Sequence, residues 1–178
     1  MSEVLSHSSL DLMDILSKIV VPLLAASFAA FFSARFALSK FYKEKWWEKR
    51  LDAFTEIINL AYRLKMANDY FLNCEYAKRG IDEEDFKPHP KGIEAQLSSE
   101  YWIDQQNLER MAQLADFTLT ANTRTILEDY VAARKKIVQD WNDEAIDSLE
   151  GSERDYALSK QLLENLVAEA KKELKIKS

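Results

Sequence analysis

Turn-forming residues and cysteine are scarce in this chain of 178 residues, which has three glycines, three prolines and one cysteine. So few glycines and prolines exclude a sandwich or barrel of many short strands. The single cysteine, Cys74, excludes an internal disulfide framework and a cysteine-based metal cluster, so most of the chain is expected in a reducing compartment. Because 47% of the residues are hydrophobic, disorder is excluded as well. The composition therefore predicts an all-α protein.

Lysine and arginine are fewer than aspartate and glutamate beyond the first 50 residues. Residues 1–50 contain seven Lys and Arg against five Asp and Glu, a net charge of +2, whereas residues 51–178 contain 17 against 25, a net charge of −8. An acidic body repels phosphate, so we expect no direct binding of nucleic acid. A basic collar beside an apolar run indicates a membrane instead.

The longest apolar run, Ile19–Leu38, contains one charged residue, Arg35. Its length matches the roughly 30 Å hydrocarbon layer of a bilayer, and we predict a single transmembrane helix over residues 19–38. A secretory signal peptide and a buried core helix are the alternatives. A signal would place basic residues ahead of the run, but residues 1–18 hold three acids and one lysine. A core helix would show a polar face, which residues 20–32 lack apart from Ser27.

Lysine and arginine mostly follow the run rather than precede it, and the positive-inside rule then places the following domain in the cytoplasm. We predict a bacterial inner-membrane protein with a short extracytoplasmic segment (residues 1–18), one span and a cytoplasmic domain (residues 39–178). Basic and aromatic residues near the cytoplasmic boundary are the expected membrane-interface anchors: Arg35, Lys40, Tyr42, Lys43, Trp46 and Trp47. Alternatively, Trp46 and Trp47 belong to the core of the domain.

One half of the predicted span carries small side chains when successive residues are placed about 100° apart. The other half carries Phe28, Phe31, Phe32 and Phe36 together with Arg35. Small residues at four-residue spacing let helix backbones approach closely in lipid, so we predict that they form the interface of a homo-oligomer. The predicted interface comprises Ala25, Ala26, Ala29, Ala30, Ser33, Ala34 and Ala37. The alternative is that alanine is simply common in single spans.

Beyond the span, apolar residues recur at three- and four-residue steps, which predicts helices. The first continues from the span and ends where Arg79–Gly92 gathers two glycines and two prolines. Others are predicted over residues 93–116, from a cap at Thr120 or Asn122 to about residue 142, and from a cap at Ser152 onward, after a connector at 143–151. We expect a four-helix bundle. Its inward-facing residues are Leu51, Phe54, Ile58, Ala61, Tyr62, Leu97, Tyr101, Leu108, Met111, Ala112, Ala115, Ile126, Leu127, Tyr130, Val131, Ile137, Val138, Trp141, Tyr156, Leu162, Leu163, Leu166, Val167, Ala170 and Leu174.

Groups that carry catalysis are few. The two histidines, His7 and His89, fall on opposite sides of the predicted membrane, which excludes a two-histidine metal site or dyad within one domain. Cys74 lies at helical spacing from Phe71 and is expected to be a packing thiol. There is no glycine-rich phosphate loop, and the acidic run at residues 82–85 lacks the ligand spacing of a calcium loop. We predict no catalytic residue, no cofactor and no metal, and therefore no enzyme.

Three segments carry a resemblance to a known family: WWEKRLDAFTEIINLAYRLK (Trp46–Lys65), FTLTANTRTILEDY (Phe117–Tyr130) and AKKELK (Ala170–Lys175). With the N-terminal span, they resemble the membrane-anchored, HEPN-like accessory proteins of RNA-targeting type VI CRISPR systems. The resemblance implies a HEPN-like bundle, assembly into a membrane pore and a role in antiviral defence, with an RNA-guided nuclease acting upstream.

The same resemblance does not imply RNA cleavage. HEPN ribonucleases use an arginine followed after four to six residues by a histidine, but Arg79 is separated from His89 by nine residues. Arg154 has Ser159 where the histidine would stand. Two functions remain open: a self-associating pore or membrane-perturbing effector, and a membrane-tethered adaptor that binds a cytoplasmic partner through the Arg79–Gly92 loop with Tyr101 and Trp102. A HEPN-type ribonuclease is disfavoured.

Overall fold

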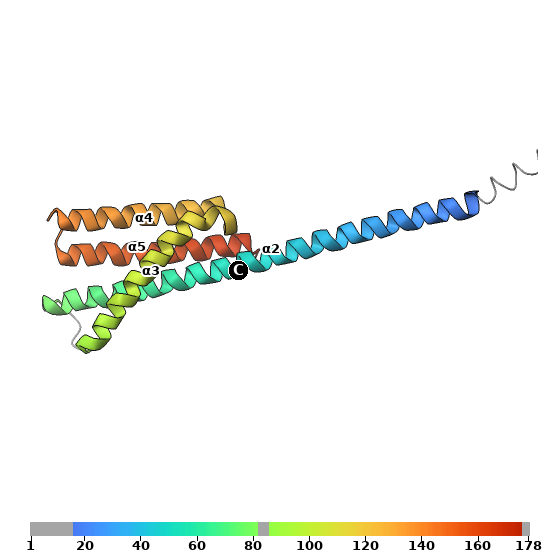
Figure 1. Cartoon of the computed structure of the whole chain (residues 1–178). Coiled ribbons are helices and arrows are strands. Elements are labelled where there is room, and N and C mark those ends of the chain that lie inside the picture. The colour runs from blue at the N-terminus through green and yellow to red at the C-terminus, as the bar shows by residue number, and fades with distance from the viewer. Residues whose placement is uncertain (1–15, 82–85, 176–178) are drawn as a thin grey trace, which may run out of the picture. The chain divides into compact units, whose positions relative to one another are not determined.

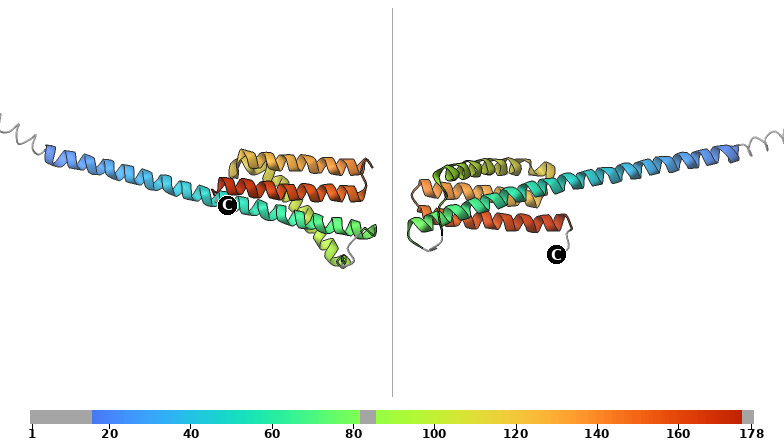
Figure 2. Two further views of the ribbon diagram at one scale, coloured as in Figure 1. Left: turned by 180° about the vertical axis from the view of Figure 1, so that it is seen from behind. Right: turned by 90° about the horizontal axis from the view of Figure 1, so that it is seen from below.

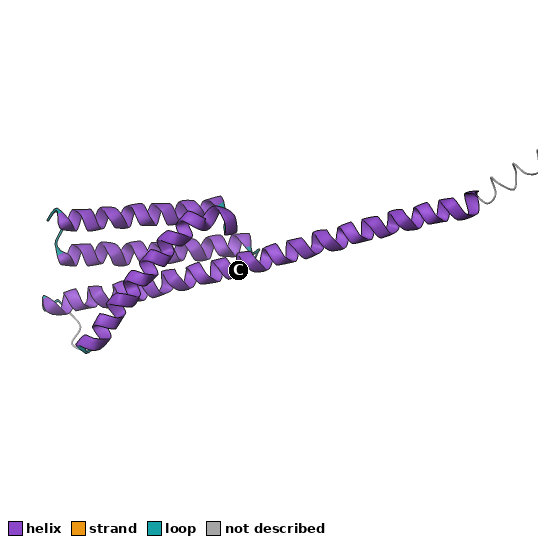
Figure 3. Ribbon diagram, viewed as in Figure 1, coloured by secondary structure: helices purple, strands orange, loops and turns teal. Residues whose placement is uncertain are grey.

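The structure is a computed structural model that describes residues 16–81 and 86–175 (Figure 1). The described residues form one π-helical turn, η1 (Leu16–Val20), and four α-helices: α2 (Val21–Lys78), α3 (Lys91–Thr118), α4 (Ala121–Asn142) and α5 (Ser148–Glu173). Figure 3 shows helices and short connections but no strand in this part of the chain, so the all-α prediction is confirmed. Most of the predicted extracytoplasmic segment and the acidic run at 82–85 lie outside the described residues.

The chain divides into two units, Met1–Glu48 and Lys49–Ser178. Helix α2 is continuous across the division, and Pro22, which has no N–H to donate, lies just after the π-helical turn η1. Side chains at positions 18–48 are all exposed. By length and composition the apolar part of this helix is sufficient to cross a membrane, and none of it is buried within the structure.

The second unit contains residues 49–78 of α2 together with α3, α4 and α5. Figures 1 and 2 show α4 and α5 side by side, with α3 crossing obliquely. The end of α2 runs antiparallel to α5, because Asn68 Nδ2 donates to the main-chain oxygen of Asp155 at 3.2 Å and Tyr76 Oη donates to Glu153 at 2.9 Å. At the other end of this pair, Arg50 lies 3.5 Å from Glu173. These four helical segments form the bundle.

The core draws on all four helical segments, as the three- and four-residue spacing predicts. The fully buried side chains include Phe54, Ile57 and Leu64 of α2, Leu108 of α3, Leu127 of α4 and Leu166 of α5. The predicted inward residues Tyr101, Ala112, Ala115, Tyr130, Leu162 and Ala170 are also buried, and Ile58, Leu97, Met111, Ile126, Val131, Leu163 and Leu174 pack against them.

Two predicted core aromatics are not in the core. Tyr62 is 53% exposed and Trp141 is 57% exposed. Trp141 lies in the last turn of α4, where it borders a cavity rather than a packed interior. Trp46 and Trp47, which belong to the first unit, are about half exposed as well.

The helix ends confirm one predicted cap and correct another. Thr120 caps α4, because its Oγ accepts a hydrogen bond from the Thr123 N–H at 3.1 Å. The prediction that Ser152 caps the last helix is wrong. Asp147 caps α5 instead, accepting from the Glu150 N–H at 2.9 Å, and Ser152 lies inside the helix. A carboxylate serves as well as a hydroxyl at this position, so Asp147 starts the helix one turn before the serine.

The predicted break after the first helix is confirmed by a specific motif. Gly80 has a positive φ of 63°, its N–H bonds to Ala77 O at 3.2 Å, and the N–H of Ile81 bonds to Tyr76 O at 3.0 Å. This pair of bonds defines a Schellman motif, which favours glycine at the left-handed position. Helix α2 therefore ends at Lys78, and α3 begins at Lys91 after the predicted loop.

Candidate functional site

The predicted oligomer interface lies on the exposed apolar part of α2. Ala25, Ala26, Ala29, Ala30, Ser33, Ala34 and Ala37 are all helical and all exposed. Ser27 on the same segment donates its Oγ proton to Leu23 O at 2.8 Å, so its hydroxyl is satisfied within the helix. The helix face that carries these small residues is therefore uncovered, and the Ser27 hydroxyl has a hydrogen-bond partner within its own helix.

The predicted interface anchors are also exposed, and they are placed beside neighbours on the same helix. Arg35 borders a shallow depression of about 210 Å³ with Phe32, Phe36 and Ser39, as expected if it shares the phenylalanine half. Lys40 lies 3.8 Å from Glu44 one turn later. Exposed pairs of this kind contribute little to stability, about 0.3–0.5 kcal/mol. The remaining anchors, Tyr42, Lys43, Trp46 and Trp47, are exposed.

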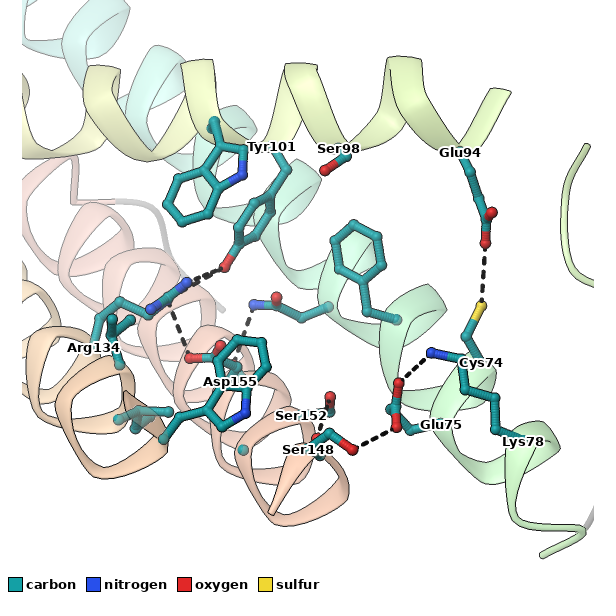
Figure 4. A pocket seen from close by; sticks show the side chains of 17 residues that line it. Cys74, Glu75, Lys78, Glu94, Ser98, Tyr101, Arg134, Ser148, Ser152 and Asp155 are labelled. Atoms are coloured by element: carbon teal, nitrogen blue, oxygen red, sulfur yellow. Dashed lines mark hydrogen bonds and ion pairs between the residues drawn. The ribbon is translucent and has the colours of Figure 1, made fainter. Parts of the chain in front are cut away.

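A cavity that the sequence did not predict lies inside the second unit. It has a volume of about 290 Å³ and is lined by α2, α3, α4 and α5 (Figure 4). Helix α5 contributes Ser148, Gly151, Ser152 and Asp155, which follow the i, i+3, i+4, i+7 spacing of one helix face. Further along α5 the same face carries buried leucines at 162 and 166. The cavity exists because small side chains occupy positions where a packed core would have large ones.

Aromatic and aliphatic side chains form much of the cavity wall. Phe71 of α2 packs edge-on against Tyr101 of α3, with ring centroids 5.6 Å apart, and Tyr101 packs edge-on against Trp102 at the same separation. Ile137 and Val138 of α4 complete this wall, and the exposed Trp141 borders it. Apolar walls with a few placed polar groups are typical of ligand pockets, which range from about 300 to 1,000 Å³.

Arg134 of α4 organises the polar end of the cavity (Figure 4). Its Nη2 donates to Tyr101 Oη at 3.1 Å, and its Nε lies 3.2 Å from Asp155 Oδ1. The guanidinium carbon also lies 6.0 Å from the ring centroid of Tyr101 and 5.9 Å from that of Trp102, within cation–π range. Behind it, Gln105 Nε2 donates to both Tyr101 Oη (3.0 Å) and Tyr130 Oη (2.9 Å).

Burial changes the pKa values of Asp155 and Tyr101 at this end of the cavity. Loss of hydration raises the pKa of Asp155 to about 6, although the Arg134 guanidinium lowers it. Asp155 Oδ1 is buried and accepts no aligned hydrogen bond within the described part of the chain, which is consistent with a destabilised carboxylate. Burial also raises the pKa of Tyr101, so this phenol is neutral at physiological pH.

At the opposite end of the cavity, Glu75 and Glu94 have different partners. Glu75 pairs with Lys78 and accepts from Ser148 Oγ at 2.8 Å. Glu94 accepts from two neutral donors, Tyr70 Oη at 3.1 Å and Cys74 Sγ at 4.0 Å. Among the described residues no lysine or arginine pairs with Glu94. Its negative charge is therefore not neutralised by an ion pair there.

Cys74 is buried, as expected of a packing thiol. Burial raises its pKa, which keeps the sulfur protonated and poorly nucleophilic. His89 also has a structural partner. Its ring stacks on the Tyr70 ring with centroids 4.6 Å apart, and its main-chain N–H donates to Tyr70 Oη at 2.9 Å. These contacts fasten the described end of the loop to α2.

The two arginines considered for a ribonuclease motif lie among carboxylates. Arg79 lies 3.2 Å from Asp147, and Arg154 lies 2.6 Å from Glu150 and 3.3 Å from Asp140. Tyr101, considered for an adaptor surface, is buried, whereas its neighbour Trp102 is exposed. Among the residues that the structure describes, no cluster of three or more His, Cys, Asp or Glu side chains has metal-binding geometry.

The sequence contains a signal for the cavity that the apolar pattern alone misses. Ser148, Gly151, Ser152 and Asp155 occupy the inward face of a helix in front of a regular leucine stripe. If Ser152 were the cap, residues 143–151 would form a connector, and Ser148 and Gly151 would not be recognised as part of that helix face. Extending the leucine spacing backwards from Leu162 by about four turns reveals it.

Comparison with known proteins adds no relative: no protein-family model, no curated protein and no solved structure matches the chain. The likeness to HEPN-like accessory proteins therefore remains a prediction from the three sequence segments.

Proposed function

We propose that this protein is a single-span membrane protein that self-associates through the small face of α2 and acts as a pore or membrane-perturbing effector. The observation that carries the proposal is the exposure of the whole apolar segment Ile19–Leu38. A soluble core helix would bury this segment within the chain, and large exposed apolar surfaces are costly in water. In a bilayer the same surface is in its preferred solvent.

Self-association follows from the small side chains. Lipid tails are as apolar as leucine, so helices associate in a bilayer through close packing and interhelical hydrogen bonds. Ala26, Ala30 and Ala34 recur one turn apart and leave room for a neighbouring backbone. The basic residues beyond Leu38 favour a cytoplasmic second unit and a bacterial inner-membrane location. A role in antiviral defence downstream of an RNA-guided nuclease rests on the resemblance alone.

A membrane-tethered adaptor is the second candidate, because α3 exposes apolar side chains. Trp102, Ile103, Leu114 and Phe117 are each about half exposed or more. Such a surface fits a partner protein better than it fits water. The adaptor requires neither an oligomer nor a membrane leak, which separates it from the first candidate.

The test is to purify the full chain in detergent, measure its mass, and then reconstitute it into vesicles loaded with a small dye. The pore proposal predicts a discrete oligomer and dye release that increases with the protein-to-lipid ratio. A monomer that leaves the vesicles sealed would contradict it. Capture of one dedicated cytoplasmic protein by such a monomer would support the adaptor.

A further inference from the structure

The cavity of the second unit has an uneven distribution of charge. Five carboxylate, lysine or arginine side chains line it, three acidic (Glu75, Glu94, Asp155) and two basic (Lys78, Arg134). Each basic group already has an acidic partner within the cavity: Lys78 pairs with Glu75, and Arg134 pairs with Asp155. Glu94 is the acidic group left with neutral donors only among the described residues. Lys78 interacts with the charge of Glu94 but forms its ion pair with Glu75, so an anionic ligand would meet a carboxylate that has no ion pair of its own.

The aromatic walls of the cavity indicate the shape and size of the apolar part of a ligand. Phe71 and Tyr101 both line the cavity, and their rings pack edge-on against each other. Their edge-to-face packing leaves aromatic surface that suits a flat apolar body. The volume of about 290 Å³ is at the small end for ligand pockets, which limits the body to about one or two rings.

No neighbouring segment requires a small side chain at Gly151 or Ser152, the two α5 residues in the middle of the cavity wall. A Cβ added at Gly151 would meet only Ile146 Cδ1, at an ordinary 3.8 Å. Ser152 Oγ donates to its own helix at Ser148 O, 2.9 Å away. Larger side chains at such positions would fill the cavity and gain apolar burial, so the open volume costs stability.

We propose that this cavity binds a small organic cation, with an ammonium group at the Glu94 carboxylate and a flat apolar body against Phe71 and Tyr101. The proposal is independent of the proposed membrane function. Binding covers apolar wall and gives Glu94 a cation hydrogen-bonded directly to its carboxylate, in addition to its two neutral donors. An amine is preferred over a neutral analogue of the same shape because hydrogen bonds to charged groups are the stronger ones.

The test uses three probes that each carry one phenyl ring on a short chain and differ in the polar group: phenethylamine, 2-phenylethanol and phenylacetate. Each is titrated calorimetrically into the full-length protein in detergent at neutral pH. We expect the amine to bind at least about tenfold more tightly than the alcohol, and the carboxylate to bind most weakly. Ser152→Leu fills the cavity and serves as the blank, since uptake of probe by the micelle is the same with this variant.

Charge is tested separately from shape. Glu94→Gln should abolish the advantage of the amine over the alcohol, whereas Glu109→Gln, an exposed glutamate on the same helix, should retain it. Thermal unfolding followed by circular dichroism checks that each variant is folded. Equal affinity for amine and alcohol, tighter binding of phenylacetate, or no difference between the wild type and Ser152→Leu would each overturn the proposal. If Glu94→Gln fails to fold, the ranking of the three probes on the wild-type protein still decides.

Discussion

The side-chain amide of Asn122 donates a hydrogen bond of 2.7 Å to Glu169 Oε2, joining the start of α4 to the end of α5. The other oxygen of Glu169 accepts from Thr120 Oγ at 3.1 Å. Thr120 in turn caps α4. One buried carboxylate therefore holds the capping turn of one helix against another, and the negative charge lies at a helix N-terminus, where the helix dipole favours it.

Replacing Glu169 with alanine should lower the free energy of unfolding by about 1–3 kcal/mol, because Asn122 and Thr120 lose a charged acceptor in a buried setting. The full chain in detergent is unfolded thermally and followed by circular dichroism. Glu164→Ala, at an exposed position on the same helix, is the matched control and should change stability by less than about 0.5 kcal/mol. Equal effects of the two substitutions would show that the Glu169 contacts add nothing.

Gly80, just after α2, and Gly151, in the first turn of α5, should respond oppositely to alanine. Gly151→Ala is expected to stabilise by about 0.5–1 kcal/mol, because the added methyl group finds ordinary contact and alanine favours the helix. Gly80→Ala should destabilise by about 1 kcal/mol, because Gly80 has a φ of 63°. Thermal unfolding of both variants measures the difference, and a destabilised Gly151→Ala would mean that the wall of the cavity is more tightly packed than this structure has it.

Asp155 makes stability depend on pH. Burial raises its pKa in the folded state to about 6, above the value of about 3.9 in an unfolded chain. The folded protein therefore holds the proton more tightly, and this stabilising contribution is complete below about pH 4 and is lost as the pH rises through about 6.

The measurement for Asp155 is the stability difference between the wild type and Asp155→Asn across this range. The wild type should lose up to about 2 kcal/mol relative to the variant between about pH 4 and pH 6.5, and the difference should be constant above that. Asp140→Asn, which removes a similarly exposed carboxylate that is paired with Lys136 and Arg154, is the control. A difference that grows in favour of the wild type as the pH rises would show that Arg134 outweighs burial.

Local patterns predicted much of the fold because the responsible interactions are local. The spacing of Phe54, Ala61, Tyr101, Leu127 and Leu166 correctly placed them inside, and the glycines and prolines of the loop marked its position. Trp141 was placed wrongly, since the apolar spacing of α4 does not reveal that the facing positions on α5 are small.

The cavity was not predicted because it arises from contacts between distant segments. Arg134 and Asp155 lie on different helices, and Glu94 is a half-buried glutamate whose neutral donors come from another helix. A single sequence shows each of these as a polar residue on an amphipathic helix. The small residues at 148, 151 and 152 were the one local sign of open space, and the position of the α5 cap decides whether they share a face.

Self-association through the small residues of α2 is tested most directly by comparing Ala30→Leu with Phe28→Leu. The oligomer mass of each variant is measured on the full chain in detergent. The membrane potential is measured in cells that express each variant. Ala30 lies on the small face, and Phe28 lies on the opposite half of the same segment. We expect Ala30→Leu to insert into membranes but to lose the oligomer and the depolarisation, because the larger side chain separates the backbones. Phe28→Leu should keep both. An Ala30→Leu protein that retains its oligomer and depolarises the membrane like the wild type would contradict self-association through this face.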